Sequence, residues 1–328
     1  MTLEEFLAQW NDASPCMEVK TSGSTGVPKH IYIEKERMRA SARMTYNFLG
    51  LRQGDTALLC MPLDYIAGKM MVVRALERGL KLLSVEPSSH PLCSTNIESI
   101  GNPSCIDFAA MVPLQVWNTL QVPEEREAMC RIRHLIIGGG AISPELEQEL
   151  RTLPINIWSS YGMTETLSHI ALRGITEDYY TPLPGITLAQ DHDGCLIIDA
   201  PHLCSETIFT NDIARFTGTN RFQIIGRRDN TICSGGIKIQ IEEIEAWLHS
   251  MGIDNVMVTC REDSALGQAI VYLTSSEIDT DILRKSVPKD IPNSKYWLPR
   301  NIIKVPSLPL TPTGKPDRAE ARRIAGSG

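Results

Sequence analysis

The chain has 328 residues, of which 42% are hydrophobic and 22% charged, a composition typical of a globular protein with two or three domains. Its formal net charge of −7 argues against bulk attraction to nucleic acid or to an anionic membrane, so neither is an expected partner. No apolar run approaches the length of a transmembrane helix, and the acidic residues 1–5 carry no signal-peptide pattern. The nine cysteines are scattered without a C-x-x-C pair, which predicts reduced thiols in a cytoplasmic protein.

A short amphipathic helix is predicted at residues 3–10, and a loop rich in hydroxyl side chains and glycine follows at residues 21–29. Hydroxyls donate to phosphate oxygens, and glycines let backbone N–H groups curve around an anion. Lys29 adds a positive charge at the end of the loop. These features predict a phosphate-binding loop, which is not of the Walker type because that pattern is absent. A flexible connector is the alternative.

Strand and helix patterns alternate after this loop. Strands are predicted at 30–33, 56–60, 80–85, 131–137 and 155–159. Helices are predicted at 34–48, at 69–78, at 113–130 in two pieces and after Ser143-Pro144, whereas 86–104 is predicted to be a loop. The alternation favours an α/β fold with a parallel, layered sheet.

Two further loops have unusual compositions. Gly138-Gly139-Gly140-Ala141 follows one predicted strand, and residues 161–166 (YGMTET) follow the next. Ligands of open α/β sheets bind at the carboxyl ends of the strands. We therefore expect both loops to meet the 21–29 loop at one crevice.

The pattern changes twice in the second half of the chain. Short strands separated by Pro, Gly and Asp predict a small β-rich part at 168–226, beside the α/β part at 21–167. Residues 230–328 predict a compact α+β unit with a turn at Ser234-Gly235-Gly236 and an irregular loop at 309–318 before a last helix. The predicted domains are therefore 1–226 and 230–328, with a hinge at 227–230.

Taken together, these segments resemble the acyl-adenylate-forming superfamily of acyl-CoA synthetases, luciferases and adenylation domains. The loop at 21–29 is similar to its phosphate motif, and 161–166 matches Y-G-x-T-E. Residues 209–212 (FTND) resemble T-G-D, with Asn211 where glycine is usual. Residues 226–245 and 309–318 are similar to the hinge motif and to P-L-T-x-x-G-K-x-x-R. The resemblance implies a large N-terminal domain and a small mobile C-terminal lid.

The resemblance also implies the chemistry. A carboxylate attacks the α-phosphate of ATP to give an acyl adenylate and pyrophosphate, and the thiolate of coenzyme A then displaces AMP. Lys315 would bridge the acid and the α-phosphate, Thr164 would donate to the α-phosphate, and Glu165 would help to hold Mg²⁺. A solvated lysine at 315 and a turn-capping Thr164 are the alternatives.

By the same resemblance, a set of residues would contact the nucleotide: Thr21, Ser22, Gly23, Ser24, Thr25, Gly26, Lys29, Gly139, Gly140, Ala141, Tyr161, Asp212 and Arg227. Tyr161 would pack on adenine and Asp212 would bind the ribose hydroxyls. Asp229 would be the hinge residue, and Gly235 and Gly236 would let the coenzyme A arm pass. A half-buried core tyrosine and a simple turn aspartate are the alternatives for Tyr161 and Asp229.

The segment 62–79 resembles the corresponding part of the o-succinylbenzoate–CoA ligases, with Asp64-Tyr65 where Phe-His is usual. Tyr65 and Gly140 would then border the acid. Lys69 and Arg74 would hold its second carboxylate, or else be solvated or pair with Glu77. This resemblance implies o-succinylbenzoate as the expected substrate.

Other interpretations stay open. An adenylating enzyme could load an amino or aryl acid onto a carrier protein, and a non-catalytic nucleotide-binding relative is a third possibility. Only 20 residues precede the phosphate loop, where relatives carry a long subdomain. The chain is expected to be either a compact member or a truncated form, and a compact form could gain support as a homodimer.

Overall fold

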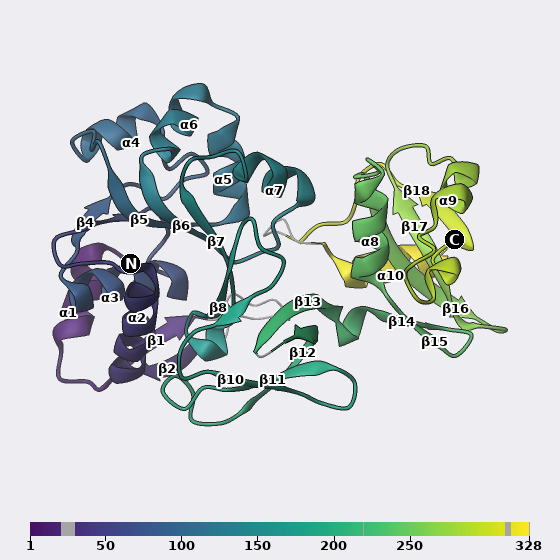
Figure 1. The fold of residues 1–328 in the computed structure, drawn as a ribbon, viewed down its shortest axis with the longest axis horizontal. Helices are drawn as coiled ribbons and strands as arrows, with labels where there is room; N and C mark the ends of the chain where they lie inside the picture. The colour runs from purple at the N-terminus through teal and green to yellow at the C-terminus, as the bar shows by residue number, and fades with distance from the viewer. Residues whose placement is uncertain (21–29, 219, 312–315, 328) are drawn as a thin grey trace. The chain divides into compact units, whose positions relative to one another are not determined.

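The computed structural model describes residues 1–20, 30–218, 220–311 and 316–327 (Figure 1). These residues divide into two compact units. One unit comprises residues within 1–189, 197–208 and 216–223, and the other comprises residues within 190–196, 209–215 and 224–328. In the part of the chain that is described, no helix is long and apolar enough to cross a membrane.

A seven-stranded sheet forms the centre of the first unit, in the order β4-β3-β5-β6-β7-β8-β9. Strands β3 to β7 run parallel to one another, whereas β8 pairs antiparallel with both β7 and β9. Their bounds are β3 Thr56–Leu59, β4 Lys81–Ser84, β5 Ile106–Met111, β6 Ile132–Ile137, β7 Asn156–Gly162, β8 His169–Gly174 and β9 Thr181–Pro182. The predicted parallel α/β sheet is thus confirmed, but β5, which lies between β3 and β6, is not among the predicted strands.

Helices cover both faces of this sheet (Figure 1). They are α1 Leu3–Asn11, α2 Lys35–Leu49, α3 Ile66–Arg78, α4 Ser94–Ser99, α5 Pro113–Leu120, α6 Pro123–Met129 and α7 Pro144–Leu150. Helix α4 corrects the prediction of a continuous loop at 86–104, because the burial of Ile97 holds a polar segment in a helix. The helices α4 to α7 pack with strand residues such as Leu58 and Leu135 in one apolar cluster.

Two smaller sheets complete the N-terminal half. Strands β1 Cys16–Lys20 and β2 His30–Glu34 are antiparallel, and their register pairs Lys20 with His30. The pairing places Lys20 and His30, the residues on either side of the 21–29 segment, opposite each other. Strand β1 was not predicted. Four strands of the β-rich part have the order β10-β11-β12-β13, with bounds β10 Thr187–Gln190, β11 Cys195–Asp199, β12 Ile208–Thr217 and β13 Arg221–Arg227.

The C-terminal part has an α+β arrangement, as predicted. Its strands are β14 Thr231–Ser234, β15 Ile237–Gln240, β16 Val256–Asp263, β17 Gly267–Thr274 and β18 Asn301–Lys304. Its helices are α8 Ile241–Ser250, α9 Thr280–Ser286 and α10 Arg318–Ser327. The turn between β14 and β15 is confirmed, with positive φ at Gly235 and Gly236, which suits glycine. Strand β18 was not predicted; it pairs in parallel with β17.

The two faces of this sheet are covered by different helices. Val258 and Ile270 pack with Ile244 and Leu248 of α8 in one cluster. Met257 and Val271, one residue along each strand, pack instead with Ala321 and Ala325 of α10 in another. Successive strand residues point to opposite faces, so α8 and α10 lie on opposite sides of the sheet.

Candidate functional site

The glycine loop lies at the carboxyl end of β6. A Cβ at Gly138 would come within 2.4 Å of Ser160 Oγ on β7, and one at Gly139 would meet Val112 at 3.4 Å, just before α5. Gly139 also has φ +83°, which only glycine adopts readily. Ser143 caps α7 as predicted, accepting from Leu146 N at 3.2 Å. Glycine is therefore favoured at Gly139 by its φ and at Gly138 by the close approach of Ser160.

The YGMTET segment continues directly from β7. The strand runs to Gly162 and so includes Tyr161, which corrects the predicted end at residue 159. Residues Thr164–Thr166 form a 3-10 turn. Buried Thr166 Oγ1 accepts from Met163 N at 3.0 Å and donates to Ser168 O at 2.7 Å. The turn is anchored by Thr166, while Thr164 is half-buried and Glu165 is exposed.

Thr164 and Glu165 are thus presented at the carboxyl end of a parallel strand. Thr164 begins the turn rather than capping it, since the capping position is Met163. The exposed carboxylate of Glu165 is a suitable oxygen ligand for Mg²⁺, which usually takes one or two carboxylates together with substrate phosphates. No three His, Cys, Asp or Glu side chains of the described residues gather into a metal site of their own.

The backbone at the start of β8 packs closely against Gly162, just before the Thr164–Thr166 turn. A Cβ at Gly162 would lie 2.3 Å from Ser168 O and 2.6 Å from His169 Cα. Both contacts are with backbone, which cannot give way as a flexible side chain would. The beginning of β8 therefore passes directly over this glycine.

Tyr161 belongs to an aromatic group. Its ring meets Phe222 edge-on with centroids 5.5 Å apart, and Tyr180 lies 6.1 Å away. Tyr180 in turn stacks on Phe222. Because the Tyr161 ring is half-buried, it fits both an adenine-packing role and a core role.

Behind the turn, four side chains form a buried polar chain. Arg74 Nη2 donates to Ser168 Oγ at 2.7 Å, and Ser168 Oγ lies 3.3 Å from His169 Nδ1. His169 Nε2 lies 3.0 Å from Thr45 Oγ1 on α2. Sequence reasoning missed Thr45, Ser168 and His169, because nothing local marks them. These four hydrogen-bonded side chains connect α2 and α3 to the residues that follow the YGMTET segment.

Arg74 is only 2% exposed, and Lys69 is likewise 2% exposed. The structure therefore contradicts the alternative that they are solvated. It also contradicts pairing with Glu77, whose carboxylate contacts Arg39 at 3.1 Å and Arg43 at 3.7 Å. Among the residues described, no carboxylate pairs with Arg74, and its Nε has no hydrogen-bond partner. Burial lowers the pKa of Arg74 to about 9, so it remains charged at neutral pH.

His169 gives this cluster a predictable pH dependence. Burial, and then the charge of Arg74, lower the pKa of His169 well below its ordinary value. The unfolded chain therefore binds a proton that the folded chain rejects, and stability should fall as the pH drops below about 6.5. Replacing His169 with Gln should reduce that slope by up to about 1.4 kcal/mol per pH unit. Urea unfolding between pH 5 and pH 7 checks this.

The matched control is His192→Gln, because the side chain of His192 is 88% exposed. It should leave the slope unchanged. An unaltered slope in the His169 variant would contradict a buried neutral imidazole.

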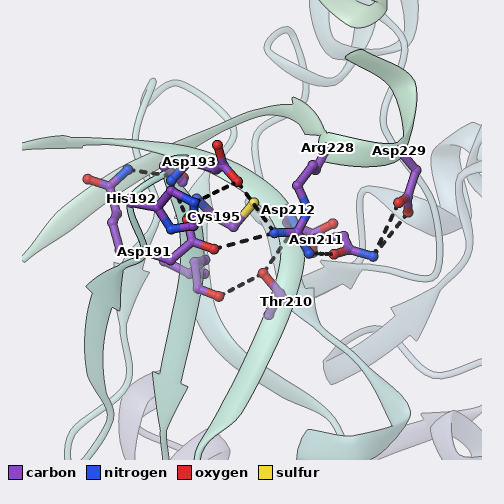
Figure 2. A network of polar contacts seen from close by, with 12 residues as sticks. Asp191, His192, Asp193, Cys195, Thr210, Asn211, Asp212, Arg228 and Asp229 are labelled. Carbon is purple, nitrogen blue, oxygen red and sulfur yellow. Dashed lines mark hydrogen bonds and ion pairs between the residues drawn. The ribbon is translucent and has the colours of Figure 1, made fainter.

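The predicted ribose and hinge residues form one network (Figure 2). Arg227 Nη1 donates to Asp212 Oδ1 at 3.0 Å, and its Nη2 donates to Asp229 Oδ2 at 3.2 Å. Asn211 Nδ2 donates to both oxygens of Asp229, at 3.3 and 3.2 Å, and Arg228 donates to Asn211 Oδ1. Asn211, which stands at the glycine position of the T-G-D motif, therefore bridges two residues of the predicted hinge. Its side-chain role was missed from the sequence, although the departure itself was visible.

A nucleotide would have to rearrange this network, because Asp212 and Arg227 pair with each other. This pair is neither a surface pair nor a buried one, because Arg227 is 49% exposed and Asp212 is 14% exposed. The same network includes Asp191 and Asp193, 3.5 and 3.8 Å from Arg228 Nη1 (Figure 2).

The remaining predicted residues differ in what the structure describes. Tyr65 precedes α3 and is 52% exposed. A Cβ added at Gly140 would lie 3.8 Å from the side chain of Pro113. The phosphate-loop residues Thr21 to Lys29 and the catalytic candidate Lys315 lie outside the described residues.

Known proteins resemble this chain in sequence and in fold. A family model described as AMP-binding enzyme matches residues 8–204. The chain belongs to the AMP-binding enzyme family. The predicted relationship to acyl-adenylate-forming enzymes is thereby confirmed.

Several members of the family show how far the similarity extends. A solved acyl-CoA synthetase (AMP-forming)/AMP-acid ligase II-like protein from Dyadobacter fermentans is 32% identical and has a TM-score of 0.65, covering 98% of this chain and 93% of its own. The 2-succinylbenzoate–CoA ligase of Salmonella typhimurium is 27% identical over 84% of this chain. Surfactin synthase subunit 2 of Bacillus subtilis is 25% identical over 92%. The chain spans 62% of the length of that ligase and 9% of that synthase.

The fold is also shared with the o-succinylbenzoate coenzyme A synthetase of Bacillus subtilis, solved in complex with ATP and magnesium ion. That structure has a TM-score of 0.73 at 21% identity, and the match covers 92% of this chain and 69% of the other.

Proposed function

We propose that the chain acts as an ATP-dependent acid–CoA ligase that works through an acyl adenylate, with o-succinylbenzoate as its acid. The products would be o-succinylbenzoyl-CoA, AMP and pyrophosphate. Membership of the AMP-binding enzyme family supports the reaction class, and the names of the similar ligases support the acid. The single observation that carries the choice of a dicarboxylate is Arg74, a buried guanidinium without a carboxylate partner among the described residues.

The roles follow from the site. Thr164 and exposed Glu165 stand on an anchored turn, where they would meet the α-phosphate and its metal ion. Mg²⁺, held by Glu165 and phosphate oxygens, would supply positive charge to the triphosphate. Lys315 would contribute positive charge between the two reacting anions, and the 21–29 loop would hold the other phosphates.

The nucleoside would occupy the glycine loop and the Asp212 network. Tyr161 would pack on the adenine, and Gly139 to Ala141 would border it through their backbone. Asp212 would accept from the ribose hydroxyls once Arg227 turns to the phosphates. The C-terminal domain, 230–328, would then rotate about 227–230 at Asp229, and Gly235 and Gly236 would face the coenzyme A arm.

Arg74 would pair with the carboxylate that does not react, and Lys69 and Tyr65 would border the same end of the acid. An uncompensated buried charge is costly, so an incoming carboxylate would gain a partner already in place. Ser168 orients the guanidinium from a point just beyond the YGMTET turn. The acid would thus be held within reach of the turn that would contact the α-phosphate.

Replacing Arg74 with Met should raise the KM for o-succinylbenzoate by about 10- to 100-fold, because hydrogen bonds to a charged group are lost. The KM for benzoate analogues with one carboxylate should change little. Pyrophosphate release at varied acid concentration measures both.

Arg78→Met is the matched control, since Arg78 lies on the same helix and donates to Leu51 O instead. It should leave both constants unchanged. Equal increases for the mono- and dicarboxylic acids in the Arg74 variant would contradict the proposed contact.

The alternative is an adenylating enzyme that passes its acyl group to a carrier protein. It is favoured by the match of surfactin synthase subunit 2 to 92% of the chain. Dependence of product formation on coenzyme A separates the two functions.

All nine cysteines are free thiols in the structure, which supports the proposal of a cytoplasmic location. The homodimer stays a prediction for sedimentation to test.

A further inference from the structure

The segment that carries Lys315 has both its ends fastened. Asp317 N donates to Pro309 O at 3.0 Å, and Leu310 and Pro316 form an antiparallel bridge. Asp317 Oδ1 then accepts from Glu320 N at 3.0 Å in the first turn of α10. The stem of this segment is therefore continuous with the start of α10.

Arg318, the first residue of α10, secures that stem to the rest of the unit. Its Nη1 and Nη2 each donate to one oxygen of Glu245 on α8, both at 2.6 Å. Nη1 also donates to Val258 O on β16 at 3.2 Å, and Glu245 Oε1 accepts from Val258 N at 2.9 Å. One two-pronged ion pair thus joins three elements that are up to 73 residues apart in the sequence.

The surroundings make this pair rigid. The side chains of Arg318 and Glu245 are only 21% and 17% exposed. Paired, parallel N–H···O bonds fix both distance and orientation, which a single bond or a lysine would not do. The two side chains also come from opposite faces of the sheet, since α8 and α10 cover different sides.

A second ion pair in α10 has similar hydrogen bonds but does not connect the helix to another element. Arg323 and Glu320 also make two short bonds, at 2.7 and 2.6 Å. They lie within α10 itself, three residues apart, with side chains 68% and 39% exposed. This second pair fastens nothing to the sheet, so it provides a matched control.

We propose that Arg318 and Glu245 are a positioning pair, which sets the place of the Lys315 segment for the adenylation step. The inference rests on the proposed function, in which Lys315 acts between the acid and the α-phosphate. Displacement of a charged group by about 1 Å can reduce a rate by about 100-fold. The thioester step would not need the pair, because under the proposed function the C-terminal domain would then have rotated and Lys315 would act only in adenylation.

The experiment compares Arg318→Met, Arg318→Lys and Glu245→Gln with Arg323→Met. Three readouts are taken: acid-dependent exchange of pyrophosphate into ATP, conversion of synthetic acyl adenylate to thioester by coenzyme A, and hydrogen exchange of the peptide 309–318. Arg318→Met should lower adenylation by about 10- to 100-fold and leave the thioester step within about twofold. The adenylation rate of Arg318→Lys should lie between those of the unaltered protein and Arg318→Met, because lysine keeps the positive charge but cannot make the two parallel hydrogen bonds.

Hydrogen exchange follows the stem directly. The Asp317 amide should exchange about tenfold faster or more in Arg318→Met, and no faster in Arg323→Met. Equal losses in both half-reactions, or full adenylation activity in the variants, would overturn the inference. If Arg318→Met does not fold, Arg318→Lys and Glu245→Gln are judged by the same criteria.

The proposed function and the positioning pair would be overturned by different results. Absence of acyl adenylate in the unaltered protein with every acid would overturn the proposed function. Unchanged exchange at Asp317 in all the Arg318 and Glu245 variants would overturn the positioning pair, whichever acid is the substrate.

Discussion

Replacing Lys315 with Ala is expected to lower the rate of acyl-adenylate formation by about 100- to 1,000-fold, the range seen when one donor to a developing charge is removed. The physical reason is that the reacting carboxylate and the α-phosphate are both anions. Without a positive charge between them, the transition state loses electrostatic stabilisation and the barrier to adenylation rises. Exchange of labelled pyrophosphate into ATP measures this step alone.

The matched control is Lys304→Ala. Lys304 is an exposed lysine of β18 in the same unit, paired with Glu277, and its loss should leave the exchange rate unchanged. Conversion of synthetic acyl adenylate to thioester should survive in the Lys315 variant. A Lys315 variant that exchanges pyrophosphate at the rate of the unaltered protein would remove this residue from the mechanism.

Replacing Gly162 with Ala should have the largest effect on stability near the site. The new Cβ would lie 2.3 Å from Ser168 O, so the backbone between β7 and β8 has to move. Overpacking of this kind costs about 1–3 kcal/mol of unfolding free energy. Movement of the adjoining Thr164–Thr166 turn should also lower adenylation by about 100-fold.

Gly140→Ala serves as the control, because its Cβ would make only an ordinary contact, 3.8 Å from Pro113. Thermal unfolding of the two variants should therefore differ by several degrees. Equal stability of Gly162→Ala and the unaltered protein would show that the β7–β8 connection is less tightly packed than these distances indicate.

The sequence predicted the order of the elements better than their pairing. The helices predicted at 34–48 and 69–78 end within one residue of the observed ends, where Gly50 and Gly79 adopt positive φ. Strand β5 (IDFAAM) was missed because it lacks alternation and few of its residues are β-branched. Its burial between β3 and β6 comes from long-range pairing, which no local pattern displays. Helix α4 was missed for a similar reason, as tertiary packing of Ile97 overrides a poor helical composition.

The site shows the same division. Local motifs are sufficient to identify the YGMTET turn and the Asp212–Asp229 region. They could not show that Arg74 is buried, because residues 68–75 of α3 are buried on every side of the helix, whereas a helical pattern assigns charged residues to an exposed face. Nor could they join Arg318 to Glu245, or His169 to Thr45, because these contacts depend on how distant elements pack.

The most direct test of the central claim is mass spectrometry of the products formed from ATP, Mg²⁺, coenzyme A and o-succinylbenzoate, with Lys315→Ala in parallel. The account predicts o-succinylbenzoyl-CoA and AMP with the unaltered protein, and loss of both with the variant. Acyl adenylate without thioester would favour transfer to a carrier protein. Neither product, with this acid or with a panel of aryl, fatty and amino acids, would contradict the assignment of this chain as an acid–CoA ligase.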